Sequence, residues 1–359
     1  KQPEVDPAKL GVTGHSMGGR LTVQLTGIDD RVKAAVPSCG GSGDFTGDPA
    51  TFPGGAPSKR SARDLATRSE NPYIDRLKVP TLWFSPTNDF HAHLFNFAYT
   101  WRDVPAGILG FSIPPHFNHR STDEHNLTTT LWFEQYLKSA YQLPTTPQLR
   151  LESQAANGQA VFTVTTEAGR AVKAVRVYAT ADAHALTAFW RTVPTTAVGK
   201  SWQATVPVLD AKDPLFVYAD VSYETPEAYR KVATNPGVGR SETFALSSRV
   251  LVLTGAQLAE AGVKPSAQRD RSIDNGVQGW QDWFRLNWGN PDHWVATTRK
   301  VKDPLWRGPQ GARLAFEINP ANDTVLYVSM TRNAWGAFGA GTGEYVATVP
   351  LKANGGWVT

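Results

Sequence analysis

The chain has 359 residues, of which 41% are hydrophobic and 19% are charged, as in a globular protein with more than one domain. Its formal net charge is only +4 and its Lys and Arg residues form no block, which argues against nucleic-acid binding. No apolar run is long enough to span a membrane, and the single cysteine, Cys39, excludes an intrachain disulfide.

Residues 1–147 alternate short apolar strands with helical stretches, the pattern of an α/β domain. Residues 9–13 predict a strand, and residues 17–26 predict the helix that follows it. Further strands are expected at 32–37, 80–85 and 108–113, and a closing helix at 126–138. Two prolines within residues 143–147 indicate a linker at the end of this domain.

After the linker, apolar residues occur at every second position in several short segments, as they do in β-strands. Residues 148–250 contain five short segments of this kind with turns between them, which is typical of a fibronectin-like β-sandwich. Residues 251–359 begin with a short helix near 258–261 and continue with strands expected at 314–318 and 324–330. This last region is rich in Trp and predicts a second, incomplete β-sandwich of the jelly-roll type.

The segment Gly14-His15-Ser16-Met17-Gly18 fits the pattern G-x-S-x-G between a buried strand and a helix. This context is that of a nucleophile elbow, in which a strained turn exposes the serine hydroxyl. We expect Gly14 and Gly18 to be required where the strand and the helix approach each other. The backbone N–H of Met17, at the start of the helix, would face the oxyanion of a tetrahedral intermediate.

A serine nucleophile needs a base and an acid that orients the base, and in this fold they follow in the order Ser, Asp, His. Asp89 comes directly after the strand at 80–85, where ligands collect in open α/β sheets. His119 lies on the loop after the strand at 108–113, with His116 as the second choice. The predicted catalytic residues are therefore Ser16, Asp89 and His119.

The other histidines have less specific surroundings. His15 and His116 are expected to line the substrate pocket, and His125 to lie at the surface or cap a helix. His91 and His93 could join His116 and His119 in a metal site, but the spacing is loose and we predict neither a metal nor a cofactor. Cys39 could face the pocket, although a buried cysteine more commonly behaves as a small hydrophobe.

Several motifs resemble the dienelactone hydrolase and acetyl xylan esterase branch of the α/β-hydrolases. They are the elbow at 5–19, the strand at 31–36, Pro86-Thr87-Asn88-Asp89, Phe117-Asn118-His119 and the closing helix at 132–137. The resemblance covers about residues 1–140. It implies an ester hydrolase, with carbohydrate esters as the expected substrates, and the C-terminal half of the family's sheet. Dienelactone hydrolases use a cysteine, so Ser16 places this chain with the serine esterases.

The chain departs from this family at its beginning. Only about ten residues precede the elbow, so the first strands and the loop that gives a second oxyanion N–H are not in the sequence. We therefore expect a fragment, which alone would be inactive, of a secreted or periplasmic bacterial protein of unknown oligomeric state. Seven Trp residues after residue 279 suggest sugar binding, although Trp also fills sandwich cores. The candidates are Trp280, Trp283, Trp288 and Trp294, which cluster near a polar loop.

Two other functions remain open. A peptidase of the prolyl-oligopeptidase type would use the same three residues, although it would usually carry a β-propeller or sandwich upstream. A carbohydrate-binding or surface module on a decayed hydrolase core needs no catalysis, but the retained order of Ser16, Asp89 and His119 argues against decay.

Overall fold

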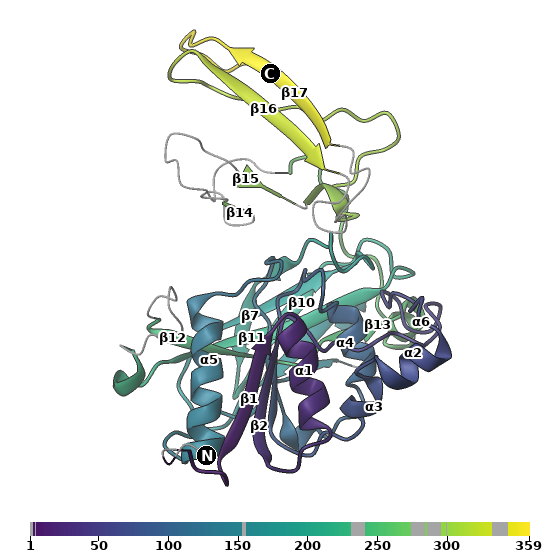
Figure 1. The fold of residues 1–359 in the computed structure, drawn as a ribbon. Coiled ribbons are helices and arrows are strands. Elements are labelled where there is room, and N and C mark those ends of the chain that lie inside the picture. The colour runs from purple at the N-terminus through teal and green to yellow at the C-terminus, as the bar shows by residue number, and fades with distance from the viewer. Residues whose placement is uncertain are drawn as a thin grey trace. The chain divides into compact units, whose positions relative to one another are not determined.

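The computed structural model describes residue 3 and residues 5–152, 156–230, 241–273, 284–285, 296–298, 300–331 and 344–359. Residues 1–306 form one compact unit and residues 307–359 a second, smaller one (Figure 1). The domain boundaries expected at residues 147 and 250 both fall inside the first unit, and the division into three domains stays a prediction.

A sheet of four parallel strands forms the α/β part of the first unit. Its order is β1 (Leu10–His15), β2 (Val32–Ser38), β3 (Thr81–Phe84) and β4 (Leu109–Ser112), and each matches a strand predicted from the sequence. β3 and β4 are buried throughout and β2 at all but one residue, as their near-continuous apolar sequences require in a parallel sheet. β1 lies at the edge of the described sheet and is only partly buried.

Helices cover both faces of this sheet. In Figure 1, α1 (Met17–Thr26) and α3 (Asn71–Ile74) lie on one side of β1 and β2, and α5 (Asp123–Phe133) lies on the other. The predicted closing helix begins three residues early because Thr122 caps α5 and two acidic residues follow in its first turn. The other helical segments of the α/β part are α2 (Ala62–Thr67), α4 (Leu94–Thr100), a 3₁₀ turn at Ala106–Ile108 and a π-helical turn at Glu134–Lys138.

Two antiparallel sheets follow the α/β part. The first has the order β5 (Gln148–Leu151), β6 (Ala160–Thr165), β10 (Ser201–Val206) and β9 (Thr195–Val198). The second has the order β12 (Thr243–Ser247), β11 (Leu215–Glu224), β7 (Val172–Thr180) and β8 (Arg191–Val193), and β13 (Leu251–Leu253) also pairs with β11. The α6 helix (Gly255–Glu260) comes next, and its assignment confirms the short helix predicted there. Classification of the sheets as a fibronectin-like sandwich stays a prediction.

The α/β sheet and the two antiparallel sheets share their apolar cores. One cluster joins Leu82 and Leu131 of the α/β part to Phe162, Val217 and Phe244 of the antiparallel sheets. A second cluster joins the aromatic side chains of β3 and α4 to those of β7, β11 and the loop before β8. Because burial of each large side chain stabilises the fold by about 1.5–3 kcal/mol, these parts stabilise one another.

Aromatic stacking accounts for the tightest contacts in the second cluster. The Trp83 and Phe97 rings stack with their centroids 3.9 Å apart. Phe95 of α4 stacks on Phe216 of β11 at 4.1 Å, across the boundary between the two kinds of sheet. The predicted linker is also packed, since Leu143 is buried and the Thr146 hydroxyl donates to the carbonyl of Leu109 at 2.8 Å.

The expectation that His125 lies at the surface is wrong. Its side chain is buried between α5 and the second antiparallel sheet, where its ring nitrogens contact the hydroxyl of Thr122 at 2.7 Å and the carboxylate of Asp220 at 3.4 Å. Asp220 also accepts from the Ser247 hydroxyl, at 2.8 Å. Sequence position near a helix start could not reveal this, because the acidic partner, Asp220, lies on β11, 95 residues later in the chain.

The second unit is described mainly as a hairpin of β16 (Thr324–Thr331) and β17 (Glu344–Leu351). β16 confirms the strand predicted at 324–330. The strand predicted at 314–318 is wrong, because within the described residues only Ile318 pairs there, in an isolated bridge with Val358. Short strands β14 (Phe284–Arg285) and β15 (Ala296–Thr297) precede it in the chain, and the jelly-roll assignment stays a prediction.

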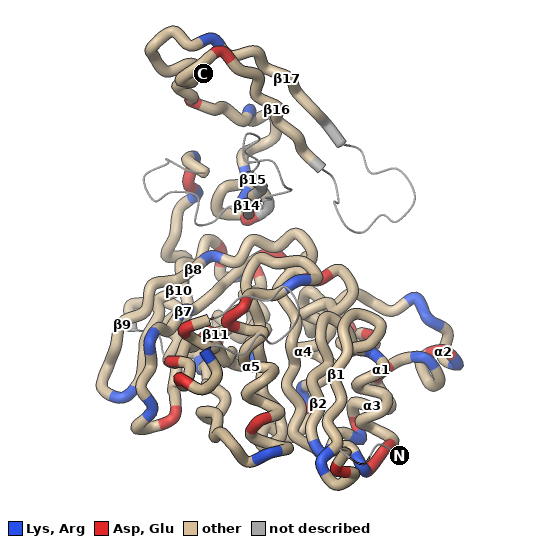
Figure 2. The backbone as a smooth tube through the Cα atoms, turned by 60° about the vertical axis from the view of Figure 1, so that its left-hand side comes forward, with Lys and Arg blue, Asp and Glu red and all other residues tan. Residues whose placement is uncertain are grey.

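The surface of the first unit combines mixed charge with an apolar stripe on α1. Figure 2 shows basic and acidic residues interspersed over the first unit. Met17, Leu21, Leu25 and Ile28, spaced three or four residues apart along and just beyond α1, are 40–70% exposed. Among the described residues, no helix has the length and apolar character needed to cross a membrane.

Candidate active site

Ser16 occupies a strained turn between β1 and α1. Its φ of 59° and ψ of −117° lie where residues other than glycine are rare, at a cost of about 1–3 kcal/mol. The backbone N–H of Ser16 donates to the carbonyl of Ser38 at 2.8 Å, and its carbonyl accepts from the N–H of Gly19 at 2.9 Å. The strain is therefore held in place by β2 and by the first turn of the helix.

Close backbone packing explains two glycines at this turn. A Cβ atom on Gly14 would lie 2.6 Å from the backbone of Gly18, and one on Gly40 would lie 2.0 Å from the carbonyl oxygen of Ser16. The expectation that Gly18 is also required is wrong, because a Cβ atom there would meet nothing within 4 Å. The close approach depends on Gly14 and on Gly40, which the sequence pattern did not single out.

Asp89 lies directly after β3 and is fully buried. One carboxylate oxygen accepts from the backbone N–H groups of His91 and Ala92, both at 2.7 Å, and the other contacts Nδ1 of His119 at 2.9 Å. Burial alone would raise the pKa of Asp89, but the hydrogen bonds from His119 and the two backbone groups outweigh it and keep the pKa below its usual value. The side chain is therefore an ionised acceptor near neutral pH.

His119 lies on the loop after β4, with a φ of 54°. Its ring packs between those of His15 and Phe90, with centroid distances of 4.6 and 4.5 Å. Because Nδ1 contacts Asp89, Nε2 is the nitrogen left to face a hydroxyl or a substrate. The structure thus brings Asp89 and His119 together and places His119 against the residue that precedes Ser16.

Asn88 positions the two loops that carry the acid and the base. Its side-chain amide donates to the carbonyls of Ala185 and Ala188, at 3.0 and 2.9 Å, and its backbone N–H donates to the carbonyl of Phe117 at 3.1 Å. The Asn118 side chain in turn accepts from the N–H of Phe90 at 3.0 Å. Sequence reasoning missed Asn88, because its partners lie about 100 residues away.

The predicted pocket residues have different surroundings. His15 is exposed, its Nδ1 lies 3.1 Å from the Ser38 hydroxyl, and partial burial followed by the charge of His119 lowers its pKa. His116 stacks on Phe189, with ring centroids 5.2 Å apart. Met17 begins α1, so its backbone N–H is one of those without an intrahelical acceptor. Trp280 and Trp283 lie outside the described residues.

Two of the four histidines considered for a metal site, His91 and His93, contact backbone carbonyls. His91 Nδ1 lies 3.0 Å from the carbonyl of Cys39, and His93 Nε2 lies 3.1 Å from that of Phe90. Across the described part of the chain, the group with ligating atoms close enough for one ion is His15, Cys39 and His119. Burial, then the charge and hydrogen bond of Asp89, raise the pKa of the Cys39 thiol well above its usual range, so the free thiol is protonated.

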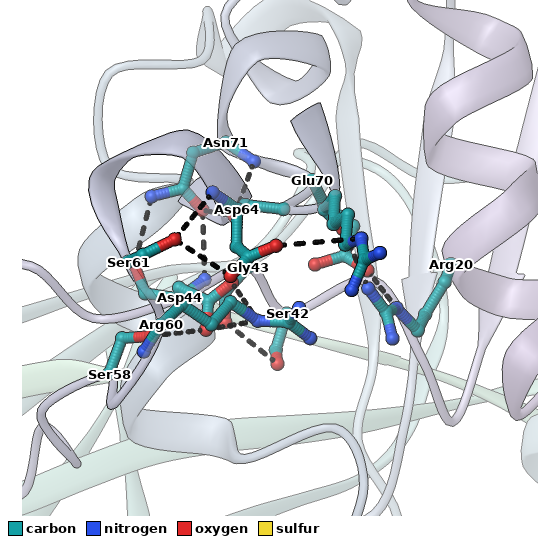
Figure 3. A network of polar contacts seen from close by, with 12 residues as sticks. Arg20, Ser42, Gly43, Asp44, Ser58, Arg60, Ser61, Asp64, Glu70 and Asn71 are labelled. Carbon is teal, nitrogen blue, oxygen red and sulfur yellow. Dashed lines mark hydrogen bonds and ion pairs between the residues drawn. The ribbon is translucent and has the colours of Figure 1, made fainter. Parts of the chain in front are cut away.

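A polar network holds the loop after β2 beside the elbow (Figure 3). The Asn71 side chain accepts from the backbone N–H of Asp44 at 2.8 Å and donates to the carbonyl of the same residue at 2.9 Å. Arg20, one turn after Ser16, pairs with Glu70 and donates to the carbonyl of Arg68 at 2.8 Å. The network therefore links the nucleophile helix to α3 and fixes the loop that follows Cys39.

Replacement of the two elbow glycines should have opposite effects. Gly14→Ala should lower the free energy of unfolding by about 1–3 kcal/mol, because the new methyl group overlaps the backbone of Gly18. Gly18→Ala should leave it unchanged or raise it by up to about 1 kcal/mol, since alanine favours a helix. Urea unfolding measures both, and equal effects of the two substitutions would contradict this account of the turn.

No protein-family model matches the chain, and no curated protein is similar to it. Among solved structures, it is similar to an acylaminoacyl peptidase from Pyrococcus horikoshii (21% identity, TM-score 0.32, 40% of this chain and 26% of that chain). It is also similar to a puromycin-hydrolysing peptidase from Mycobacterium tuberculosis (21% identity, TM-score 0.29, 37% of this chain and 22% of that chain). A third similar structure is acetyl xylan esterase 1 from a Thermoanaerobacterium species (16% identity, TM-score 0.29, 39% of this chain and 48% of that chain). The chain thus spans about a quarter to a half of the length of these proteins.

Proposed function

We propose that this protein is a serine-dependent ester hydrolase that acts through an acyl-enzyme on Ser16. The observation that carries the proposal is the 2.9 Å contact between the buried Asp89 carboxylate and Nδ1 of His119, next to a serine held at positive φ. An oriented imidazole beside a strained, half-buried serine is the arrangement that activates a hydroxyl for acyl transfer.

The reaction would proceed in two halves. The Ser16 oxygen attacks the ester carbonyl while Nε2 of His119 takes its proton. His119 then gives that proton to the departing alcohol, which leaves Ser16 acylated. A water molecule, deprotonated by His119, attacks the acyl-enzyme, and Ser16 recovers its proton as the carboxylic acid departs. Asp89 holds the imidazole in the required tautomer and stabilises its protonated form, and the Met17 N–H stabilises the oxyanion. These steps need no cofactor.

Carbohydrate esters are the proposed substrate class, supported by the sequence resemblance to acetyl xylan esterases. A peptidase is the second candidate, because the same acid, base and nucleophile cleave amides. The two candidates differ in substrate preference when the leaving groups are equally reactive. A peptidase should hydrolyse N-acyl peptides faster than simple esters, and an esterase should hydrolyse the simple esters faster.

Removal of the nucleophile tests the proposal directly. In the protein expressed from its complete reading frame, Ser16→Ala should reduce hydrolysis of p-nitrophenyl acetate by about 10⁴-fold or more in kcat. Ser201→Ala, on β10, is the matched control and should retain full activity. Equal background rates for wild type and Ser16→Ala on both p-nitrophenyl acetate and an N-acyl peptide p-nitroanilide would contradict a serine hydrolase.

Asp89→Asn should separate the role of the acid from that of the nucleophile. The variant should lose about 10⁴-fold in kcat, because it favours the wrong tautomer of His119. Its stability should also respond differently to pH. A lowered pKa in the folded state means that ionised Asp89 stabilises the fold above its ordinary pKa of 3.8, and that this contribution is lost as pH falls through the lowered value.

Acid titration of unfolding free energies measures that contribution. The difference in unfolding free energy between wild type and Asp89→Asn should be constant near neutral pH. Below pH 3.8 the wild type should lose stability relative to the variant, because Asp89 becomes protonated. A difference that does not depend on pH would show that Asp89 is not held in the ionised form.

A further inference from the structure

His15, Cys39 and His119 place three metal-binding atoms at the active site. One ligating atom from each lies within 4.8 Å of the other two. In a tetrahedral zinc site with bonds of about 2.0–2.3 Å, ligand atoms lie about 3.3–3.6 Å apart. Separations of up to 4.8 Å are wider than this, so binding requires the side chains to move closer together, and His15 is the exposed member of the three.

The three donors suit a thiophilic divalent cation. Thiolate and imidazole are the donors that zinc prefers, and two imidazoles, one thiolate and a water molecule would complete a tetrahedral site. The cluster also has the partners that orient such ligands, since Asp89 contacts Nδ1 of His119 at 2.9 Å and the Ser38 hydroxyl lies 3.1 Å from Nδ1 of His15. A carboxylate behind a metal-binding histidine is the usual arrangement in zinc proteins.

We propose that His15, Cys39 and His119 form an inhibitory site for a thiophilic divalent cation such as Zn²⁺. On binding, the Cys39 thiol loses its proton to solvent as the metal–sulfur bond forms, and the lone pair on Nε2 of His119 is used for coordination. His119 then cannot take the proton of Ser16, so the metal-bound enzyme is inactive. The inhibition rests on the proposed function, whereas the binding does not.

Cobalt(II) provides a test of binding that needs no activity. The full-length protein, stripped of metal with a chelator, should bind Co²⁺ with a thiolate-to-cobalt absorption band, and Zn²⁺ should displace it. Cys39→Ser should abolish the band. Loss of an outer partner of a metal ligand costs about 10–100-fold in affinity, so His15→Ala should weaken cobalt binding by about 100-fold or more.

His184→Ala is the matched control, because His184 is exposed, lies outside the cluster and is not part of the candidate site. It should bind Co²⁺ as the wild type does, and both should lose p-nitrophenyl acetate hydrolysis as Zn²⁺ is added. In His15→Ala the Zn²⁺ concentration for half-inhibition should rise by about the factor by which the cobalt affinity falls. Inhibition is measured as a fraction of that variant's own metal-free rate.

The outcomes separate the two proposals. Absence of the thiolate band in wild type, or an unchanged band in His15→Ala, would overturn the metal site whatever the activity. Cobalt binding in a protein that hydrolyses no ester would support the site and contradict the proposed function instead. If Cys39→Ser fails to fold, the His15→Ala result decides, since His15 is exposed and its removal leaves the core intact.

Discussion

The contact between Asp89 and His119 depends on two loops that are held from outside the α/β sheet. Asn88 donates its side-chain amide to two carbonyls before β8 and its backbone N–H to the loop of His119. The Ser247 hydroxyl on β12 accepts from the N–H of Ile113, where β4 ends. Because these groups are buried, each unmade hydrogen bond would cost about 1–3 kcal/mol, so the antiparallel sheets hold the acid and the base in register.

This arrangement explains why the sheets that follow residue 147 share their cores with the α/β part. α5 lies between them, and its Thr128 hydroxyl donates to a carbonyl of β12 at 2.7 Å. The stack of Phe95 on Phe216 joins α4 to β11. A change deep in the antiparallel sheets can therefore reach the candidate site through packing, without any contact with a substrate. The turn at Ser16 is held separately, by β2 and Gly40.

Local patterns in the sequence predicted the features that local chemistry determines. The strand, the elbow and the helix at residues 10–26 follow from apolar spacing and glycine. The order Ser, Asp, His predicted the acid and the base on the loops after β3 and β4, where the structure has Asp89 and His119 in contact. The Asn88 anchor, the buried position of His125 and the contact of Cys39 with Asp89 involve partners 50–100 residues away. Contacts between residues so far apart in the sequence leave no periodic pattern of apolar residues, so only the folded structure reveals them. The strand expected at 314–318 failed for the same reason, since an alternating pattern forms a strand only where a partner lies beside it.

The central claim is that His119, oriented by Asp89, activates Ser16. Covalent labelling with a fluorophosphonate, followed by mass spectrometry of the peptides, tests it most directly, because the reagent phosphonylates a serine only where a base removes its proton. We predict one adduct, on Ser16, which is absent in His119→Ala and in protein unfolded before labelling. An unlabelled Ser16 in the folded protein, or equal labelling in His119→Ala, would contradict the account.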